Sequence, residues 1–214
     1  MPDIRPGIYV LTDHDHENDQ QLLADVAAAL RGGASLVQFR DKTRDGQGRE
    51  RRASMLLQLC READTPLIIN DDPVLCARIG ADGLHLGRDD GDVAAARDVV
   101  GPDALIGLSC YNELDRAESA VKAGADYLAF GSVFPSDTKP DAVQAPLPLL
   151  EMAARRFSPP VCAIGGINRA NIDRVAASGA HLAAVIGSVW AGDIEANVTA
   201  LKSAFEKARG QPES

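Results

Sequence analysis

The chain has 214 residues, of which 45% are hydrophobic, and it carries a formal net charge of −9. This length suffices for one well-buried core and is short for two, so a single domain spanning residues 1–214 is expected. The acidic balance disfavours nucleic acid as a partner, and the absence of a run of about 18 apolar residues disfavours a membrane partner. Because the N-terminus lacks a signal-peptide core and the four cysteines form no CxxC pair, a cytoplasmic location with reduced thiols is expected.

Short apolar runs alternate with Ala-rich amphipathic stretches from one end of the chain to the other. Runs that are apolar on both faces are typical of strands buried between an inner core and an outer helix layer. The predicted strands are residues 7–11, 36–40, 67–70, 83–86, 105–109, 127–130, 161–164 and 182–186. The helical stretches between them include residues 19–30, 49–63, 93–100, 115–123, 147–156, 171–178 and 194–208.

A short glycine-containing unit ends a helix and opens a strand at Gly32, Gly80, Gly124 and Gly179. Glycine is favoured at left-handed helix C-caps, so these units predict four copies of one helix-to-strand connection. Together with the predicted strands, they indicate an α/β fold of the (β/α)8 TIM-barrel class. An open doubly wound sheet is the alternative, but residues 12–15 (TDHD) stand where a GxGxxG motif would follow its first strand.

The active site of such a barrel lies at the carboxyl ends of its strands, where this chain places polar residues. Gln38, Arg40 and Lys42 lie at the end of strand two with the period-two spacing that brings side chains to one side. Two cations and an amide on one side favour a clamp for phosphate or diphosphate. The alternative is a solvated strand end in which Arg40 pairs with Asp41.

Two aspartates, Asp71 and Asp90, follow the neighbouring strands three and four. Their carboxylates could share one Mg2+, which binds a few carboxylates, several waters and phosphate oxygens. Such an ion would neutralise a diphosphate held by the basic clamp. Helix capping is the alternative for the aspartates around the two following helix starts, namely Asp71, Asp72, Asp89, Asp90 and Asp92.

Glycines follow the last two strands, as Gly165-Gly166 and as Gly187 before Ser188. Many barrels bind phosphate there through backbone amides, although glycine also serves simple turns. The stretch 131–146 is long enough for an active-site loop, or else is disordered. His85 is expected to be a packed core or rim residue, and Cys110 lacks the base partner that a thiolate nucleophile would need.

Several motifs, in this order, resemble those of the thiamine-phosphate synthases over nearly the whole chain. The strongest are the QxRxK group, the NDD group with the HLG group and Asp90, and the TKP group. They lie in or directly after VQFRDK at 37–42, LIIND at 67–71, ADGLHLG at 81–87 and FPSDTKP at 134–140. Weaker matches are YVLTD at 9–13, IGLS at 106–109, GADY at 124–127 and AIGGI at 163–167.

The resemblance implies a role for each matching position. The implied contacts to the aminopyrimidine diphosphate are Gln38, Arg40, Lys42, Asn70, Ser109 and Lys139, of which Arg40, Lys42, Ser109 and Lys139 would act on the reaction. The implied ligands of one Mg2+ per subunit are Asp71 and Asp90. The implied positions for the thiazole phosphate are Ser136, Thr138, Gly166, Ile186 and Gly187.

The implied reaction joins 4-amino-2-methyl-5-(diphosphooxymethyl)pyrimidine to 4-methyl-5-(2-phosphoethyl)thiazole, or its carboxylated form, and releases diphosphate. The implied partners are small phosphorylated molecules, and a homo-oligomer is possible. Four positions depart from the family pattern: Ser136 stands where Thr is common, Asp137 adds a negative charge, Arg88 stands where Gln is usual, and Gly187 replaces a common Ser. The alternatives are a thiazole tautomerase paralogue, which needs a rim base but no diphosphate clamp, and a non-catalytic phosphate-binding barrel.

Overall fold

The computed structural model describes residues 3–12, 16, 18–41, 46–135 and 143–210. These residues form a closed barrel of eight parallel strands in the order β1-β2-β3-β4-β5-β6-β7-β8. The barrel class predicted from the repeating units is therefore confirmed. Within the described ranges, no helix is both long and apolar enough to cross a membrane.

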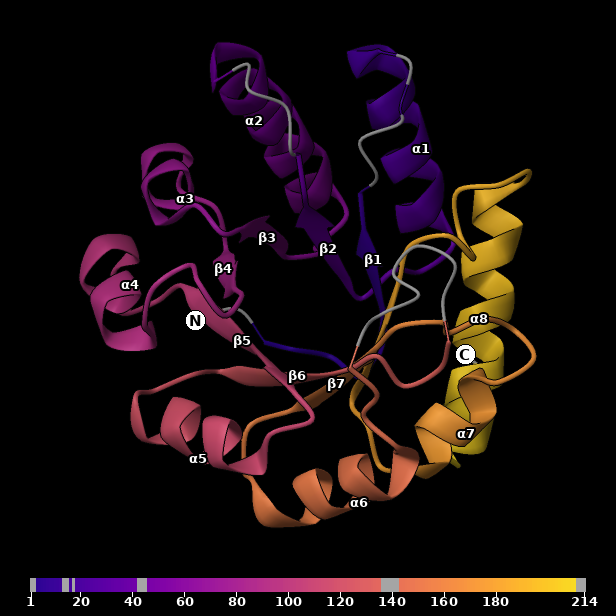
Figure 1. Cartoon of the computed structure of the whole chain (residues 1–214). Helices are drawn as coiled ribbons and strands as arrows, with labels where there is room; N and C mark the ends of the chain where they lie inside the picture. The colour runs from indigo at the N-terminus through magenta and orange to yellow at the C-terminus, as the bar shows by residue number, and fades with distance from the viewer. Residues whose placement is uncertain (1–2, 13–15, 17, 42–45, 136–142, 211–214) are drawn as a thin grey trace.

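The strands form the inner wall, and each is followed by a helix of the outer layer (Figure 1). The strands are β1 (Gly7–Leu11), β2 (Leu36–Phe39), β3 (Leu67–Asn70), β4 (Gly83–Leu86), β5 (Leu105–Tyr111), β6 (Tyr127–Gly131), β7 (Val161–Ile164) and β8 (Leu182–Val185). The helices are α1 (Asp19–Arg31), α2 (Gly46–Glu62), α3 (Pro73–Ile79), α4 (Val93–Val100), α5 (Leu114–Lys122), α6 (Leu147–Arg156), α7 (Ile172–Ala177) and α8 (Ile194–Ala208).

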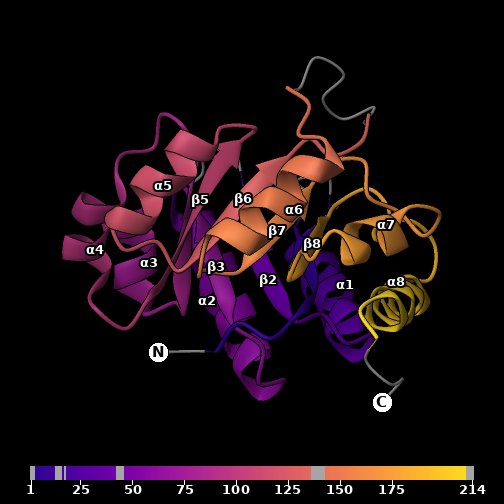
Figure 2. The same cartoon turned by 90° about the horizontal axis from the view of Figure 1, so that it is seen from below.

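Side chains alternate between two apolar cores because successive strand residues face opposite sides of the sheet. The larger core lies between the strands and the helices and includes Ile8, Val37 and Ile69. The smaller core fills the barrel and includes Tyr9, Leu36 and Ile68, one register position away on the same strands. The side view shows the strands inclined within the helix layer, with α5 and α6 across the near face (Figure 2). The apolar runs predicted from the sequence are buried on both faces for this reason.

The glycine units end helices as predicted, but the left-handed residue is not always the first glycine. Gly80 caps α3 with φ 66°, and its amide donates to the Ala77 and Cys76 carbonyls. At the end of α1, Gly32 keeps φ −68° and Gly33 takes the positive value, 88°. A side chain at a positive φ is strained, so Gly33 and Gly80 allow the tight entry into the next strand.

Candidate active site

The end of β2 places consecutive side chains on opposite sides of the barrel wall. Gln38 is buried inside the barrel, whereas Asp41 is held by Arg52 of α2 on the outside, with Nε and Nη2 at 2.9 and 2.6 Å from Oδ2. Thr12 fixes the turn, since its Oγ1 accepts from the Arg40 amide at 2.9 Å. Arg40 therefore shares the inward side with Gln38, and its charge acts on the Asp71 carboxylate.

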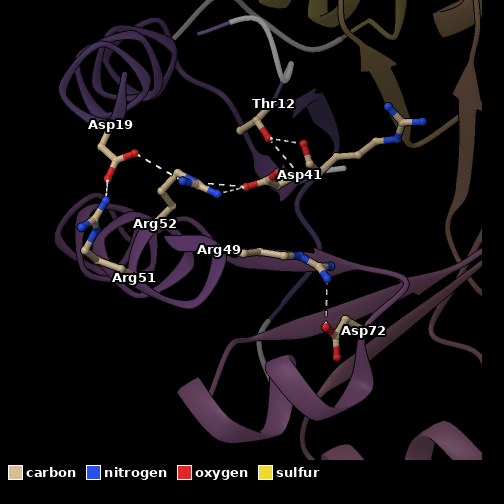
Figure 3. A network of polar contacts seen from close by, with 8 residues as sticks. Thr12, Asp19, Asp41, Arg49, Arg51, Arg52 and Asp72 are labelled. Atoms are coloured by element: carbon tan, nitrogen blue, oxygen red, sulfur yellow. Dashed lines mark hydrogen bonds and ion pairs between the residues drawn. The ribbon is translucent and has the colours of Figure 1, made fainter. Parts of the chain in front are cut away.

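The Asp41 side chain is only 8% exposed, so the alternative of a solvated surface pair at this strand end is wrong. Figure 3 shows Arg52 between Asp41 and Asp19 of α1, with Arg51 reaching Asp19 from the other side. A third arginine of α2, Arg49, donates to Asp72 at 3.1 Å and to the Asn70 carbonyl at 3.3 Å. Helix α2 thus braces the ends of β2 and β3, a role that no motif in the sequence indicated.

The aspartates near the helix starts divide into caps and mouth residues. Asp72 caps α3 by accepting from the Leu75 amide at 2.8 Å, and Asp92 caps α4 by accepting from the Ala95 amide at 2.7 Å. Asp71 caps neither of these helices and has a left-handed backbone with φ 62°. Asp90 accepts from the Gly87 amide at 2.9 Å. The capping alternative therefore holds for Asp72 and Asp92 but not for Asp71 and Asp90.

The Asp71 and Asp90 carboxyl groups lie close enough to interact at the mouth. Partial burial of the Asp71 carboxyl group, together with the neighbouring Asp90 carboxyl group, raises the pKa of Asp71 to about 6. Asn70 also donates to Asp71 Oδ2 through Nδ2. Two carboxylates this close repel each other unless a proton or a cation lies between them. Across the described ranges no group of three or more His, Cys, Asp or Glu could hold a metal, so the donors fit Mg2+ with its waters better than a multi-ligand zinc site.

Ser109 and Gln38 are joined by hydrogen bonds that cross the barrel interior. Ser109 Oγ lies 2.9 Å from His85 Nε2, and His85 Nδ1 lies 2.9 Å from the Tyr127 hydroxyl. The Tyr127 and Tyr9 hydroxyls are 2.9 Å apart, and Gln38 Nε2 donates to Tyr9 at 2.7 Å. We call these five residues the interior network. His85 is buried, as expected, but it is a hydrogen-bonded member of this network rather than simple packing.

Arg116 of α5 holds two strand ends at the same mouth. Its Nε donates to the Ser109 carbonyl at 2.7 Å, and its Nη2 donates to the Gly87 carbonyl at 3.0 Å. Arg88, which departs from the family pattern, is directed to Glu113 and lies over the Tyr111 ring at 4.6 Å. The additional charge of Arg88 is therefore paired with an acidic side chain on the rim.

The ends of β7 and β8 present backbone instead of side chains. A Cβ atom on Gly166 would lie 2.4 Å from the Pro135 carbonyl oxygen, and one on Gly165 would lie 2.1 Å from Ser132 Oγ. Both glycines also have positive φ values, 103° and 64° in chain order. Gly187 is exposed, and a Cβ there would meet nothing within 4 Å. The β7 glycines are thus required by close backbone approach, whereas Gly187 is not.

The residues on both sides of the long loop are fixed to the barrel. Ser132 donates its amide to the Val143 carbonyl at 2.8 Å, and its own carbonyl accepts from Ala145 at 2.8 Å. Phe134 donates to the Gly165 carbonyl at 3.1 Å. The predicted site residues Lys42, Ser136, Thr138 and Lys139, and the departure Asp137, lie outside the described residues.

The cysteines are not reactive groups. All four are buried and free, and burial raises the pKa of the Cys110 thiol to about 12. A thiolate nucleophile at the mouth is therefore excluded for Cys110, as its lack of a base partner predicted.

His16 is paired with Asp25 at 2.9 Å and packs edge-on against Trp190.

The whole chain is similar to proteins of one enzyme family. The family model described as thiamine monophosphate synthase matches residues 8–189. A thiamine-phosphate synthase from Nitrosococcus oceani is 46% identical over 200 residues, which cover 93% of this chain and 92% of the relative. One from Azoarcus sp. is 51% identical over 185 residues, which cover 86% and 89%.

The fold is also similar to that of a solved structure with a related name. The thiamine phosphate pyrophosphorylase from Pyrococcus furiosus is similar with a TM-score of 0.87 and 33% identity, and the match covers 96% of this chain and 98% of that protein. The match extends over the barrel and over the strand ends described above. This chain therefore belongs to the thiamine monophosphate synthase family.

Proposed function

We propose that this protein is a thiamine-phosphate synthase, a transferase that forms a carbon–nitrogen bond and releases diphosphate. It would join the pyrimidine diphosphate named above to the thiazole phosphate, or to its carboxylated form. The observation that carries the proposal is the convergence of Arg40 with the Asp71–Asp90 pair at one mouth of the barrel. A cation beside two crowded carboxylates is an arrangement suited to a metal-bound diphosphate.

The metal would be one Mg2+ per subunit, held by Asp71 and Asp90. The proximity of these carboxyl groups supports this assignment, because a divalent ion between them would relieve their repulsion. When bound, Mg2+ would neutralise charge on the diphosphate and make it a better leaving group. The role of Asn70 would be to orient Asp71 through its amide and to contact the pyrimidine diphosphate.

The chain's own residues would act by charge and position, without a covalent intermediate. An electron-rich aminopyrimidine can stabilise a cation at its methylene carbon, so diphosphate would leave before the thiazole nitrogen attacks. Arg40 would then bind the departing phosphates, with Lys42 and Lys139 proposed for the same task. Stabilisation of developing charge by preorganised groups can contribute several kcal/mol, roughly 3–4 for one strong donor.

The thiazole phosphate would lie on the opposite part of the mouth. Gly166, Ile186 and Gly187 follow β7 and β8, where backbone amides can approach a phosphate closely. Ser136 and Thr138 are proposed to add hydroxyl donors from the long loop. The partners would be these small molecules, in a cytoplasmic enzyme that can also form homo-oligomers.

A diphosphate-release assay tests the function against its two alternatives. The protein is incubated with each substrate alone and with both, with Mg2+ and with excess EDTA. The proposal predicts stoichiometric diphosphate and thiamine phosphate only when both substrates and Mg2+ are present. Isomerisation of a thiazole carboxylate phosphate without diphosphate release would indicate the tautomerase, and binding without any product would indicate a non-catalytic barrel.

A further inference from the structure

The interior network connects two residues proposed to contact the aminopyrimidine, and its middle members have no role assigned so far. Gln38 and Ser109 form its ends, and Tyr9, Tyr127 and His85 lie between them. These three are buried, and the Tyr127 ring occupies space left by Gly107, where a Cβ would lie 1.9 Å from the ring. Buried polar groups need partners, so the protons of this network are not free to arrange themselves at random.

The donor at one end fixes the direction of every later hydrogen bond. Gln38 Nε2 can only donate, so the Tyr9 oxygen accepts; because the buried Tyr9 proton also needs an acceptor, we assign it to Tyr127. Tyr127 then donates to His85 Nδ1, which must carry no proton. The His85 proton therefore sits on Nε2 and is donated to Ser109 Oγ.

The charge states of the middle residues agree with this direction. The His85 ring is buried and lies between two hydroxyl groups, which favours the neutral imidazole with one proton to place. Burial raises the pKa of both tyrosines, so each keeps its hydroxyl proton. Because Ser109 Oγ already accepts from His85, its own hydroxyl proton is available to a ligand at the mouth.

We propose that Tyr9, Tyr127 and His85 are positioning residues that select the aminopyrimidine by fixing the hydrogen-bonding polarity of Gln38 and Ser109. The Gln38 amide oxygen is then presented as an acceptor and the Ser109 hydroxyl as a donor. An aminopyrimidine offers the complement, with a donor on its exocyclic amino group and acceptors on its ring nitrogens. A 4-oxo pyrimidine with an N3–H has an acceptor in place of the exocyclic donor and a donor in place of one ring acceptor, so it would be rejected. This inference rests on the proposed function for the identity of the ligand.

The His85 tautomer in the ligand-free protein gives the direct test. Long-range 1H–15N spectra distinguish a proton on Nε2 from one on Nδ1, and the His85 signals are assigned by their loss in His85→Gln. The inference predicts the Nε2–H form in the wild-type protein. It also predicts that Tyr127→Phe, which removes the donor to Nδ1, populates the Nδ1–H form. A wild-type Nδ1–H or doubly protonated ring at neutral pH would overturn the inference, because the network would then run in the opposite direction.

Kinetics with paired substrates provide a second, independent test. In Tyr127→Phe the KM for the aminopyrimidine diphosphate should rise about tenfold, as expected for the loss of one well-oriented hydrogen bond. The KM for the thiazole phosphate should be unchanged, and the preference for the amino over the 4-oxo pyrimidine should fall about tenfold. Tyr111→Phe removes a hydroxyl outside the interior network and should change none of these values.

The outcomes separate this inference from the proposed function. If the wild-type protein releases no diphosphate, the function fails, but the tautomer measurement still decides the direction of the network. If the wild-type protein is active and Tyr127→Phe keeps both KM values and the substrate preference, the positioning role is wrong. Tyr9→Phe interrupts the network one residue earlier and should reproduce the selective rise in the KM for the aminopyrimidine diphosphate. This second variant keeps the test decisive if Tyr127→Phe does not fold.

Discussion

Between β2 and β5 the barrel mouth is lined by side chains that bind one another, whereas at β7 and β8 it is formed by glycines and backbone. The first region, the pyrimidine half, comprises Gln38, Arg40, Asn70, Asp71, Asp90 and Ser109. The second, the thiazole half, comprises Gly166, Ile186 and Gly187. In the pyrimidine half, side chains thus set the charge and the hydrogen-bonding groups that a ligand would meet. In the thiazole half, glycines without side chains allow the backbone to approach a ligand closely. Substitutions should therefore affect the two proposed substrates separately.

The largest effect is expected from Arg40→Ala, which removes a cation from the pyrimidine half. We expect kcat/KM for the pyrimidine diphosphate to fall by roughly 10²–10³, the usual loss when one preorganised donor to developing charge is deleted. The melting temperature should change little, since Arg40 lies at the mouth. Arg78→Ala, which removes an exposed arginine paired with Glu50, is the control and should keep wild-type kinetics. Near-normal turnover in Arg40→Ala would contradict its leaving-group role.

Gly166→Ala tests the thiazole half in the same way. A Cβ there would collide with the Pro135 and Phe134 carbonyls, and the residue has φ 64°. We expect a loss of about 1–3 kcal/mol of folding stability and a higher KM for the thiazole phosphate alone. Gly187→Ala is the matched control, because a Cβ there meets nothing within 4 Å and stability should stay within about 0.5 kcal/mol. An equal rise of both substrates' KM values in Gly166→Ala would remove the distinction between the halves.

A smaller effect is expected from Arg52→Ala, which acts on the pyrimidine half from behind. Arg52 and Asp41 have side chains that are 16% and 8% exposed, so the variant leaves a largely buried carboxylate without this partner. The strand end that carries Arg40 should loosen, and the KM for the pyrimidine diphosphate should rise about tenfold. Arg51→Ala removes the neighbouring, exposed partner of Asp19 and should leave the kinetics unchanged. If both variants behave alike, the bracing by α2 has no role in binding.

The smallest effect is expected from Asp71→Asn in the metal-free protein. The Asp71 carboxyl group has a pKa of about 6, above the usual 3.8, so between about pH 4 and pH 6 the folded state binds more protons than the unfolded state. Stability therefore falls as the pH rises through this window, and the full penalty remains above it. Asp71→Asn removes the charge and should raise the melting temperature at pH 7.5 in EDTA by roughly a few degrees. Asp92→Asn, at a helix cap that Asn also satisfies, should give no gain. A lower melting temperature in Asp71→Asn would show that the carboxylates do not repel each other.

The sequence predicted the barrel and most of its elements because the strand signal repeats eight times. Strand β3, helix α4 and helix α8 have the predicted bounds. The short α3 was absent from the predicted helices, although Asp72 before Pro73 marked a possible start. Seven residues carry too little periodicity to stand out from the loop around them.

Less of the site could be predicted, because its contacts join residues far apart in the chain. Tyr9 and Tyr127 are 118 positions apart and meet only when the barrel closes. Polar residues inside apolar strands, such as His85, were a usable signal that was assigned to packing. The pairing of Asp41 with Arg52 depends on the angle of α2 against β2, which no local pattern specifies.

Binding of each substrate as a function of Mg2+ tests the division of the mouth most directly. Calorimetric titrations would measure each substrate alone with the wild-type protein, Asp71→Asn and Asp90→Asn, in Mg2+ and in EDTA. The account predicts that the pyrimidine diphosphate binds tightly only with Mg2+ and both aspartates, while the affinity for the thiazole phosphate alone is the same in all six conditions. An affinity for the pyrimidine diphosphate that stays the same without Mg2+ and in both aspartate variants would contradict the account.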